Sequence, residues 1–210
     1  HLLMMSSGFN EPYLMGANRR AGVGAPDYVK YMLSRPVKVQ PGSEFVYSTA
    51  DSILAGRMVE KAVGKRLSEY LYERFFEPLG QGFPIWENCP QGHPIGGGGM
   101  FMTLSNMLKI GQVYLMDGKW KGQQLVDPAW IKEATAKQIE TPNPGNDIWV
   151  CGYGYQFWRN PYEDSYRADG AYGQLTMVLP KKGLIVAIQC PESGDLNKVK
   201  PVMHELILSL

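Results

Sequence analysis

The chain has 210 residues, which is enough for one compact domain and short for two. Lys and Arg number 21 against 20 Asp and Glu, so the net charge is +1 and there is no electrostatic case for binding nucleic acid or an anionic membrane. Gly 24 and Pro 15 make up nearly a fifth of the chain, above the typical ~12%, which predicts many turns and excludes a plain helical bundle.

Helices separated by turns are predicted for the first two thirds of the chain. Asp27 can cap a short helix over 28–33, and Ser48 or Thr49 can cap a longer one over about 50–63 that ends at Gly64. The apolar stripe of the longer helix is expected to contain Ile53, Leu54, Met58, Val59 and Val63. Further helices are expected over 69–77, after Thr103 or Ser105 as far as 115, and from Pro128 onward.

From about residue 149 the pattern changes to that of strands. Alternation over 153–158 predicts a half-buried strand, and 175–179 with 184–188 predict a β-hairpin around 180–183. Residues 199–210 form an amphipathic pattern that predicts a closing helix. Helices first and antiparallel strands last indicate an α+β fold in one domain over 1–210, with helices and loops over about 1–148 and the sheet over about 149–210.

Several kinds of site are absent from the sequence. The three cysteines form no Cys-x-x-Cys pair, which favours buried free thiols in a reducing compartment over a zinc site or a disulfide framework. The run Gly96–Gly99 lacks the Gly-Lys-Ser/Thr ending of a phosphate loop, so it is expected to let the backbone pass close to another segment or a ligand. His1, His93 and His204 are too scattered for a metal, and His93 is not expected to line a cleft. We expect no metal, no organic cofactor and no membrane span.

A series of short motifs follows one another along nearly the whole chain. In order they are Leu2-Leu3-x-x-Ser6-Ser7-Gly8, Pro41-Gly42-Ser43-x-Phe45-x-Tyr47-Ser48-Thr49, Leu54-x-Gly56-x-x-x-Glu60-x-x-x-Gly64, Pro78-Leu79-Gly80, Gly98-Gly99-Met100-Phe101-Met102-Thr103, Gly118-Lys119-Trp120 and Ala168-Asp169-Gly170-Ala171-Tyr172-Gly173-Gln174. Each motif is weak alone, but their order resembles the serine β-lactamase/penicillin-binding-protein superfamily. It looks closest to the class C-like branch of esterases, D-aminopeptidases and 6-aminohexanoate-dimer-hydrolase-like amidases. The resemblance implies a β-lactamase-like fold, an antiparallel sheet flanked by helices.

The resemblance also implies a nucleophile that these residues do not include. In the family, a Ser-x-x-Lys motif precedes the Leu-Leu segment, which here is Leu2-Leu3, and no serine of this chain has a lysine three positions on. We therefore expect the chain to be the C-terminal major part of a larger domain, truncated at its N-terminus. The missing part would hold the first helix, the first strands and the Ser/Lys pair, so the chain alone is expected to be inactive.

By resemblance, the remaining motifs carry a proton acceptor and substrate contacts. Tyr47 stands at the tyrosine of the family's Tyr-x-Asn motif, which implies a general base or proton relay whose pKa a lysine ammonium would lower. Thr49 stands at the asparagine, and its hydroxyl can donate one hydrogen bond to an acyl-side carbonyl. Ala168-Asp169-Gly170 lies where other members carry Lys-Thr-Gly or His-x-Gly, so no cation occupies the Lys/His position, although Arg167 is adjacent. Asp169 would repel a carboxylate, which favours an ester or a neutral or cationic amide over a penicillin-type substrate.

The last motif supplies the oxyanion contact. Gly170 would let substrate approach the strand, and the backbone N–H of Ala171 would be one of two oxyanion donors, the other belonging to the absent serine. Tyr172, with Trp86, Trp149 and Trp158, could line an aromatic cleft or simply pack in the core. The expected partner is a small-molecule ester, amide or peptide.

Two other interpretations stay open. One is a non-catalytic penicillin-recognising fold that serves in binding or sensing. The other is self-association through sheet edges left uncovered by the missing strands.

Overall fold

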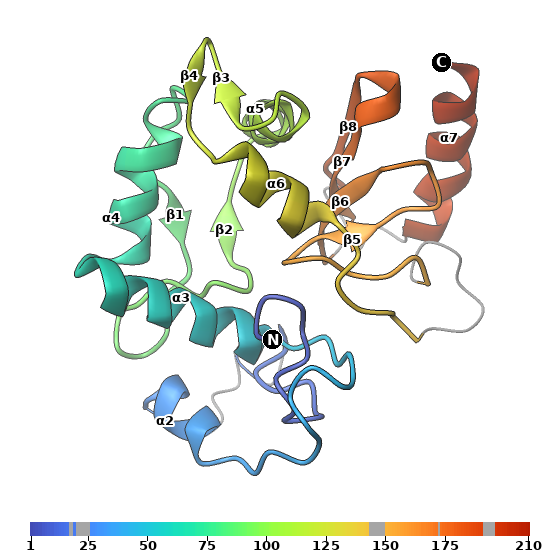
Figure 1. Cartoon of the computed structure of the whole chain (residues 1–210). Helices are drawn as coiled ribbons and strands as arrows, with labels where there is room; N and C mark the ends of the chain where they lie inside the picture. The colour runs from blue at the N-terminus through green and yellow to red at the C-terminus, as the bar shows by residue number, and fades with distance from the viewer. Residues whose placement is uncertain (17–18, 20–25, 143–149, 172, 191–195) are drawn as a thin grey trace.

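The sheet and most of the helices form two sides of the molecule in the computed structural model (Figure 1). The structure describes the chain apart from residues 17–18, 20–25, 143–149, 172 and 191–195, and apart from the side chains of 196–198 and 200. The described helices are α2 Tyr28–Leu33, α3 Thr49–Val63, α4 Leu67–Leu71 with the π-helical turn η1 Tyr72–Phe76, α5 Leu104–Leu115, α6 Pro128–Thr135 and α7 Leu196–Ser209.

A four-stranded antiparallel sheet occupies the C-terminal third, in the order β5-β6-β7-β8. Its strands are β5 Trp158–Arg159, β6 Tyr166–Gly170, β7 Gln174–Leu179 and β8 Leu184–Ile188. Two small antiparallel pairs lie among the helices: β1 Ile85–Trp86 with β2 Met100–Phe101, and β3 Lys119–Trp120 with β4 Gln123–Gln124. The expected hairpin is therefore confirmed as β7–β8, which a 3-10 turn joins over Pro180–Lys182.

Helices cover both faces of this sheet (Figure 1). Side chains alternate along β7, and those on one face pack with Met203 and Ile207 of α7. Helix α5 packs on β7 and β8 from the other side. Gly111 allows this approach, because a methyl group there would lie 2.8 Å from Ile185 Cγ2 and 3.0 Å from Thr176 Cγ2. Within the described residues, no helix is both long and apolar enough to span a bilayer.

The helix starts follow the capping residues that the sequence contains. The side chains of Asp27, Thr103 and Asp127 accept hydrogen bonds from the backbone N–H groups at the starts of α2, α5 and α6. Helix α3 begins after Ser48 and ends at Gly64, whose φ of +70° is the left-handed conformation typical of a helix end.

The buried face of α3 differs from the predicted apolar stripe. Met58 is 63% exposed and Val59 38% exposed. The helix instead buries polar side chains, among them Asp51, Ser52 and Glu60. These side chains find partners in other segments, and periodicity of apolar residues alone does not detect such a face.

Residues 153–157 bend back on themselves, with the N–H of Gly154 donating to the carbonyl of Phe157 at 2.7 Å, and β5 begins only at Trp158, so the continuous strand predicted over 153–158 is wrong. Tyr153 and Trp158 make an isolated antiparallel bridge to each other, and Gln156 between them has a φ of +66°. The N–H of Gln156 donates to the carbonyl of Leu3 at 2.8 Å, and its side chain also donates to that carbonyl. The alternating aromatic residues pack against different partners: Tyr153 against Tyr47, Tyr155 against Trp130, and Phe157 against Tyr114 and Tyr166.

The glycine run packs against the start of α3, as expected of backbone that must approach another segment. A methyl group at Gly96 would lie 2.4 Å from the carbonyl oxygen of Ser52, and one at Gly97 would lie 2.8 Å from Thr49 Cγ2. Both positions therefore require glycine, because a side chain would push the loop away from the helix.

We predict that Gly96→Ala lowers the free energy of unfolding by about 1–3 kcal/mol, because its methyl group overlaps rigid backbone. Urea denaturation measures this difference. Gly82→Ala is the matched control, since nothing lies within 4 Å of a methyl group there. Equal stability of the two variants would contradict the packing described.

Candidate functional site

Tyr47 lies half-buried in an aromatic cluster with Phe45, Tyr153 and Trp158, which also includes Met5 and Ile139. Its ring stacks on Trp158, with centroids 5.5 Å apart and planes 29° apart, and meets Tyr153 edge-on at 6.2 Å. Phe45 packs against both Tyr153 and Trp158 at 5.2 and 5.6 Å. These contacts fix the direction of the phenol relative to the sheet.

The N-terminal loop holds the segment that carries Tyr47. The N–H of Val46 donates to the carbonyl of Met5 at 2.8 Å, and the hydroxyl of Ser7 donates to Asp51 Oδ1 at 2.7 Å. Asp51 is 1% exposed, and burial raises its pKa from 3.8 to about 6. The loop therefore clamps both the residue before Tyr47 and the first turn of α3 after it.

A buried ion pair lies beneath Trp158 on strand β6. Arg167 is completely buried, and its Nε donates to Asp169 Oδ2 at 2.9 Å. Its Nη1 donates to Asn160 Oδ1 at 2.8 Å and to the carbonyl of Arg159 at 3.1 Å. The guanidinium lies 5.5 Å from the centre of the Trp158 ring. One indole therefore contacts both Tyr47 and Arg167, and it joins the α3 side of the site to the sheet.

The pairing changes what Asp169 presents to a substrate. By resemblance, no cation occupies the family's Lys/His position, although Arg167 is adjacent, so the sequence predicts that Asp169 repels carboxylates. The neighbouring Arg167 offsets that charge, and the Asp169 side chain is only 7% exposed. This edge of β6 is therefore close to electrically neutral.

Burial raises the pKa of Tyr47 above its ordinary 10.0. The carboxylate of Asp169 raises this pKa further, while Arg167 lowers it. Tyr47 is consequently protonated at neutral pH in this chain. The lowering expected from a lysine ammonium does not arise from the charges that act on Tyr47 in the described residues.

The other predicted substrate contacts are at the start of α3 and at the end of β6. Thr49 begins α3, is 6% exposed, and donates its hydroxyl hydrogen to Met15 Sδ at 3.0 Å. Gly170 is the last residue of β6, and Ala171 follows it directly and is exposed. Tyr172 lies outside the described residues.

The tryptophans separate into different roles. Trp158 packs directly on Tyr47. Trp86 donates its indole N–H to the carbonyls of Ile95 and Gly98 at 2.8 and 2.9 Å, so it fastens the glycine-rich loop. Trp149 lies outside the described residues.

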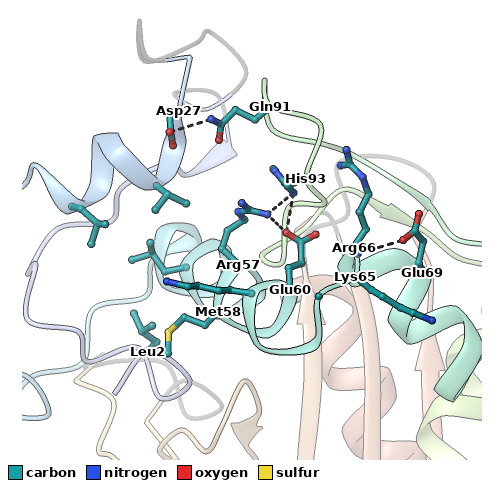
Figure 2. Close-up of a pocket in the computed structure, with 15 residues that line it drawn as sticks. Leu2, Asp27, Arg57, Met58, Glu60, Lys65, Arg66, Glu69, Gln91 and His93 are labelled. Atoms are coloured by element: carbon teal, nitrogen blue, oxygen red, sulfur yellow. Dashed lines mark hydrogen bonds and ion pairs between the residues drawn. The ribbon is translucent and has the colours of Figure 1, made fainter.

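A groove of about 860 Å³ lies elsewhere, along α3 and the loop before β2 (Figure 2). His93 lines it, contrary to the expectation from sequence. His93 Nδ1 lies 2.9 Å from Glu60 Oε2, and Arg57 contacts both residues. Glu60 Oε1 also accepts the N–H of Leu67 at 2.9 Å, which ties α3 to α4. Arg57, Glu60 and His93 are therefore one another's partners. None of the predicted site residues that the structure describes lines this groove.

Sequence reasoning missed two residues near the predicted site. Met15 and Asp51 carry no recognisable motif, and only the folded chain places them against Thr49 and Ser7. The Arg167–Asp169 pair did have a signal, because opposite charges two residues apart in a strand lie on one face. In the part of the chain that the structure describes, no three His, Cys, Asp or Glu side chains converge to hold a metal ion.

The model of the family described as Beta-lactamase matches residues 1–199. The chain belongs to the Beta-lactamase family. Among solved structures, a putative β-lactamase from Bacteroides dorei has a TM-score of 0.73 at 23% identity, over 91% of this chain and 63% of that one. A putative 6-aminohexanoate-dimer hydrolase from Bacillus anthracis has a TM-score of 0.79 at 17% identity, over 99% of this chain and 59% of that one.

A curated relative matches over a shorter stretch. It is a putative D-alanyl-D-alanine carboxypeptidase from Escherichia coli K12, 42% identical over 45 residues, which are 21% of this chain and 10% of the relative. The TM-scores of 0.73 and 0.79 show that the chain shares the fold of these two structures, and at 23% and 17% identity they show the fold alone. This chain spans about three fifths of the length of these two structures, and its match to the carboxypeptidase covers a tenth of that protein.

We predict that Asp169→Asn lowers the pKa of Tyr47, because it removes the negative charge and leaves the positive charge of Arg167. Asparagine retains an oxygen acceptor for Arg167 Nε. A ¹³Cζ-tyrosine NMR titration of the chain, with Tyr47→Phe to assign the signal, measures the shift. Asp164→Asn is the control, since that side chain is 60% exposed and pairs with Lys181. An unchanged or higher pKa in Asp169→Asn would contradict the electrostatic arrangement.

Proposed function

We propose that the complete protein is a serine hydrolase that cleaves an ester, amide or peptide bond through an acyl-enzyme. Its nucleophilic serine and the accompanying lysine would lie outside these 210 residues. Membership of the Beta-lactamase family supports the reaction class. The names of the similar proteins, which include a dimer hydrolase and a carboxypeptidase, are consistent with amide or peptide cleavage.

The stack of Tyr47 on Trp158, with Arg167 beneath the same indole, is the observation that carries this proposal. It supports a site in which Trp158 links the phenol of Tyr47, from the segment before α3, to strand β6, which ends at Gly170 and is followed by Ala171. Acyl transfer needs a proton acceptor beside the nucleophile and hydrogen-bond donors beside the carbonyl oxygen.

Each proton has a defined path in this mechanism. A lysine ammonium beside Tyr47 would favour its phenolate, which takes the serine proton as the serine oxygen bonds to the substrate carbonyl. The Ala171 N–H and the serine's own N–H would donate to the resulting oxyanion. As the bond to the leaving group breaks, Tyr47 returns the proton to that group. Water then attacks the acyl-enzyme by the same path, which releases the acid and restores the serine.

The raised pKa of Tyr47 supports the dependence on a lysine from elsewhere. Without a further cation, the phenol stays protonated and cannot accept the serine proton at neutral pH. We therefore propose that the chain alone is inactive, since it would lack the nucleophile, the activating charge and one oxyanion donor.

The ion pair on β6 affects which charge the substrate can carry. Arg167 is completely buried and pairs with Asp169, so it is not positioned to bind a substrate carboxylate. We propose that Asp169, Gly170 and Tyr172 border an ester or an uncharged or cationic amide. Thr49 would be the acyl-side hydroxyl.

Self-association is a further property that we propose for the isolated chain. Strand β8 is at the edge of the described sheet, and Val202, Leu206 and Leu208 of α7 are 67, 49 and 64% exposed. An open strand edge beside apolar side chains favours pairing between chains. A monomer by size-exclusion chromatography with light scattering would contradict it.

We predict that Tyr47→Phe in the complete polypeptide lowers kcat for p-nitrophenyl acetate by about 10²–10⁴-fold with the melting temperature unchanged, because the proton acceptor is lost. Tyr155→Phe is the matched control. Its phenol stacks on Trp130 with the same 29° tilt, outside the Tyr47 cluster, so kcat should stay near the wild-type value.

The outcomes separate the enzyme from the binding protein. Normal turnover by Tyr47→Phe would remove this residue from the mechanism. A complete polypeptide that folds and binds penicillin-like compounds but turns over no ester, amide or peptide would favour a binding or sensing role.

A further inference from the structure

The donors of Thr49 point at a single sulfur atom. Its hydroxyl donates to Met15 Sδ at 3.0 Å, and its backbone N–H lies 3.3 Å from the same sulfur. A thioether is a weak acceptor, so this is a poor partner for two good donors. The contact matters because Thr49 is the residue that the proposed function places against the acyl side of the substrate.

The loop that carries Met15 is anchored beside α3, so the contact is a built feature. Leu14 is 2% exposed in the core formed with α2 and α3. The carbonyl of Tyr13 accepts the hydroxyl of Ser48 and the N–H of Ala50, both at 3.3 Å. The two residues before Met15 are thus fixed by burial and by hydrogen bonds at the first turn of the helix.

The methyl group of Thr49 lies against backbone. The Gly97 backbone is so near that a methyl group there would be 2.8 Å from Thr49 Cγ2. With Met15 against its hydroxyl and Gly97 near its methyl group, Thr49 is only 6% exposed. A substrate carbonyl can reach the Thr49 hydroxyl only if the Met15 side chain leaves.

We propose that Met15 is a specificity-determining residue that plugs the acyl-side hydrogen-bonding position, so that the enzyme prefers esters with a short, unsubstituted acyl chain over those with an acylamino group. This proposal rests on the proposed function. An acylamino substrate would need its amide carbonyl where Met15 Sδ now lies. A short acyl chain needs no hydrogen bond at Thr49 and leaves the plug in place.

The test compares two esters with one leaving group in the complete polypeptide. p-Nitrophenyl propionate has no acylamino group, and the p-nitrophenyl ester of N-acetylglycine has one. The kcat/KM of each is divided by its rate of hydroxide hydrolysis, which removes the difference in intrinsic reactivity. The role of Tyr47 cancels in the ratio, because the leaving group is the same.

We expect the wild type to prefer the propionyl ester by at least about tenfold, roughly the value of one hydrogen bond. Met15→Ala should remove most of that preference, because it frees the Thr49 hydroxyl. Met15→Leu should keep it, since leucine has a similar volume. Met58→Ala, at a methionine 63% exposed on α3, is the control and should keep the wild-type ratio.

Each outcome supports or overturns the role proposed for Met15. A Met15→Ala ratio equal to that of the wild type, or a Met15→Leu ratio as low as that of Met15→Ala, would overturn the plug. If Met15→Ala fails to fold, a wild type that favours the acetylglycyl ester or treats the two equally overturns it. Those results leave the proposed hydrolase intact. Turnover of neither ester by the wild type overturns the hydrolase, and the plug with it.

Discussion

The contact of one indole with two partners sets the geometry of the site. Trp158 stacks on the phenol of Tyr47 and lies over the guanidinium of Arg167. Tyr47 comes from the segment before α3, whereas Arg167 belongs to β6, so the indole connects the two sides of the fold. Because Arg167 is completely buried and tied to Asp169 and Asn160, the β6 side of this connection is rigid. The contacts of Trp158 therefore set the position of the Tyr47 phenol relative to Arg167 of β6.

Polar groups in the interior support this arrangement. Asp51 in the first turn of α3 accepts the Ser7 hydroxyl, and the next residue, Ser52, donates to the Gln156 side chain at 2.7 Å. Gln156 in turn donates to the carbonyl of Leu3. Buried hydrogen bonds of this kind are costly to leave unmade, so the N-terminal loop, α3 and the turn before β5 hold one relative position.

The sequence predicted the elements whose signals are local. The caps Asp27, Thr103 and Asp127 begin their helices as expected, and the β7–β8 hairpin is where the turn residues placed it. The strand predicted over 153–158 is wrong, because its alternating aromatics pack in different places: Tyr153 contacts Tyr47, whereas Tyr155 stacks on Trp130 and Phe157 contacts Tyr114 and Tyr166. Only the order of the motifs, through the family resemblance, predicts Tyr47 and Asp169 as site residues. The spacing of Arg167 and Asp169 along one strand is a local signal for their ion pair. The connection of Tyr47 to β6 through Trp158 and the contact of Met15 with Thr49 arise only from tertiary packing, which no local pattern encodes.

We propose that Tyr47 accepts the proton of a serine that lies outside residues 1–210. Labelling of the complete polypeptide with a fluorophosphonate, followed by tandem mass spectrometry of the adduct, locates that serine. We expect one modified serine, outside residues 1–210, and much slower labelling when Tyr47 is replaced by phenylalanine. An adduct on a serine within residues 1–210, or a labelling rate that does not depend on Tyr47, would contradict it.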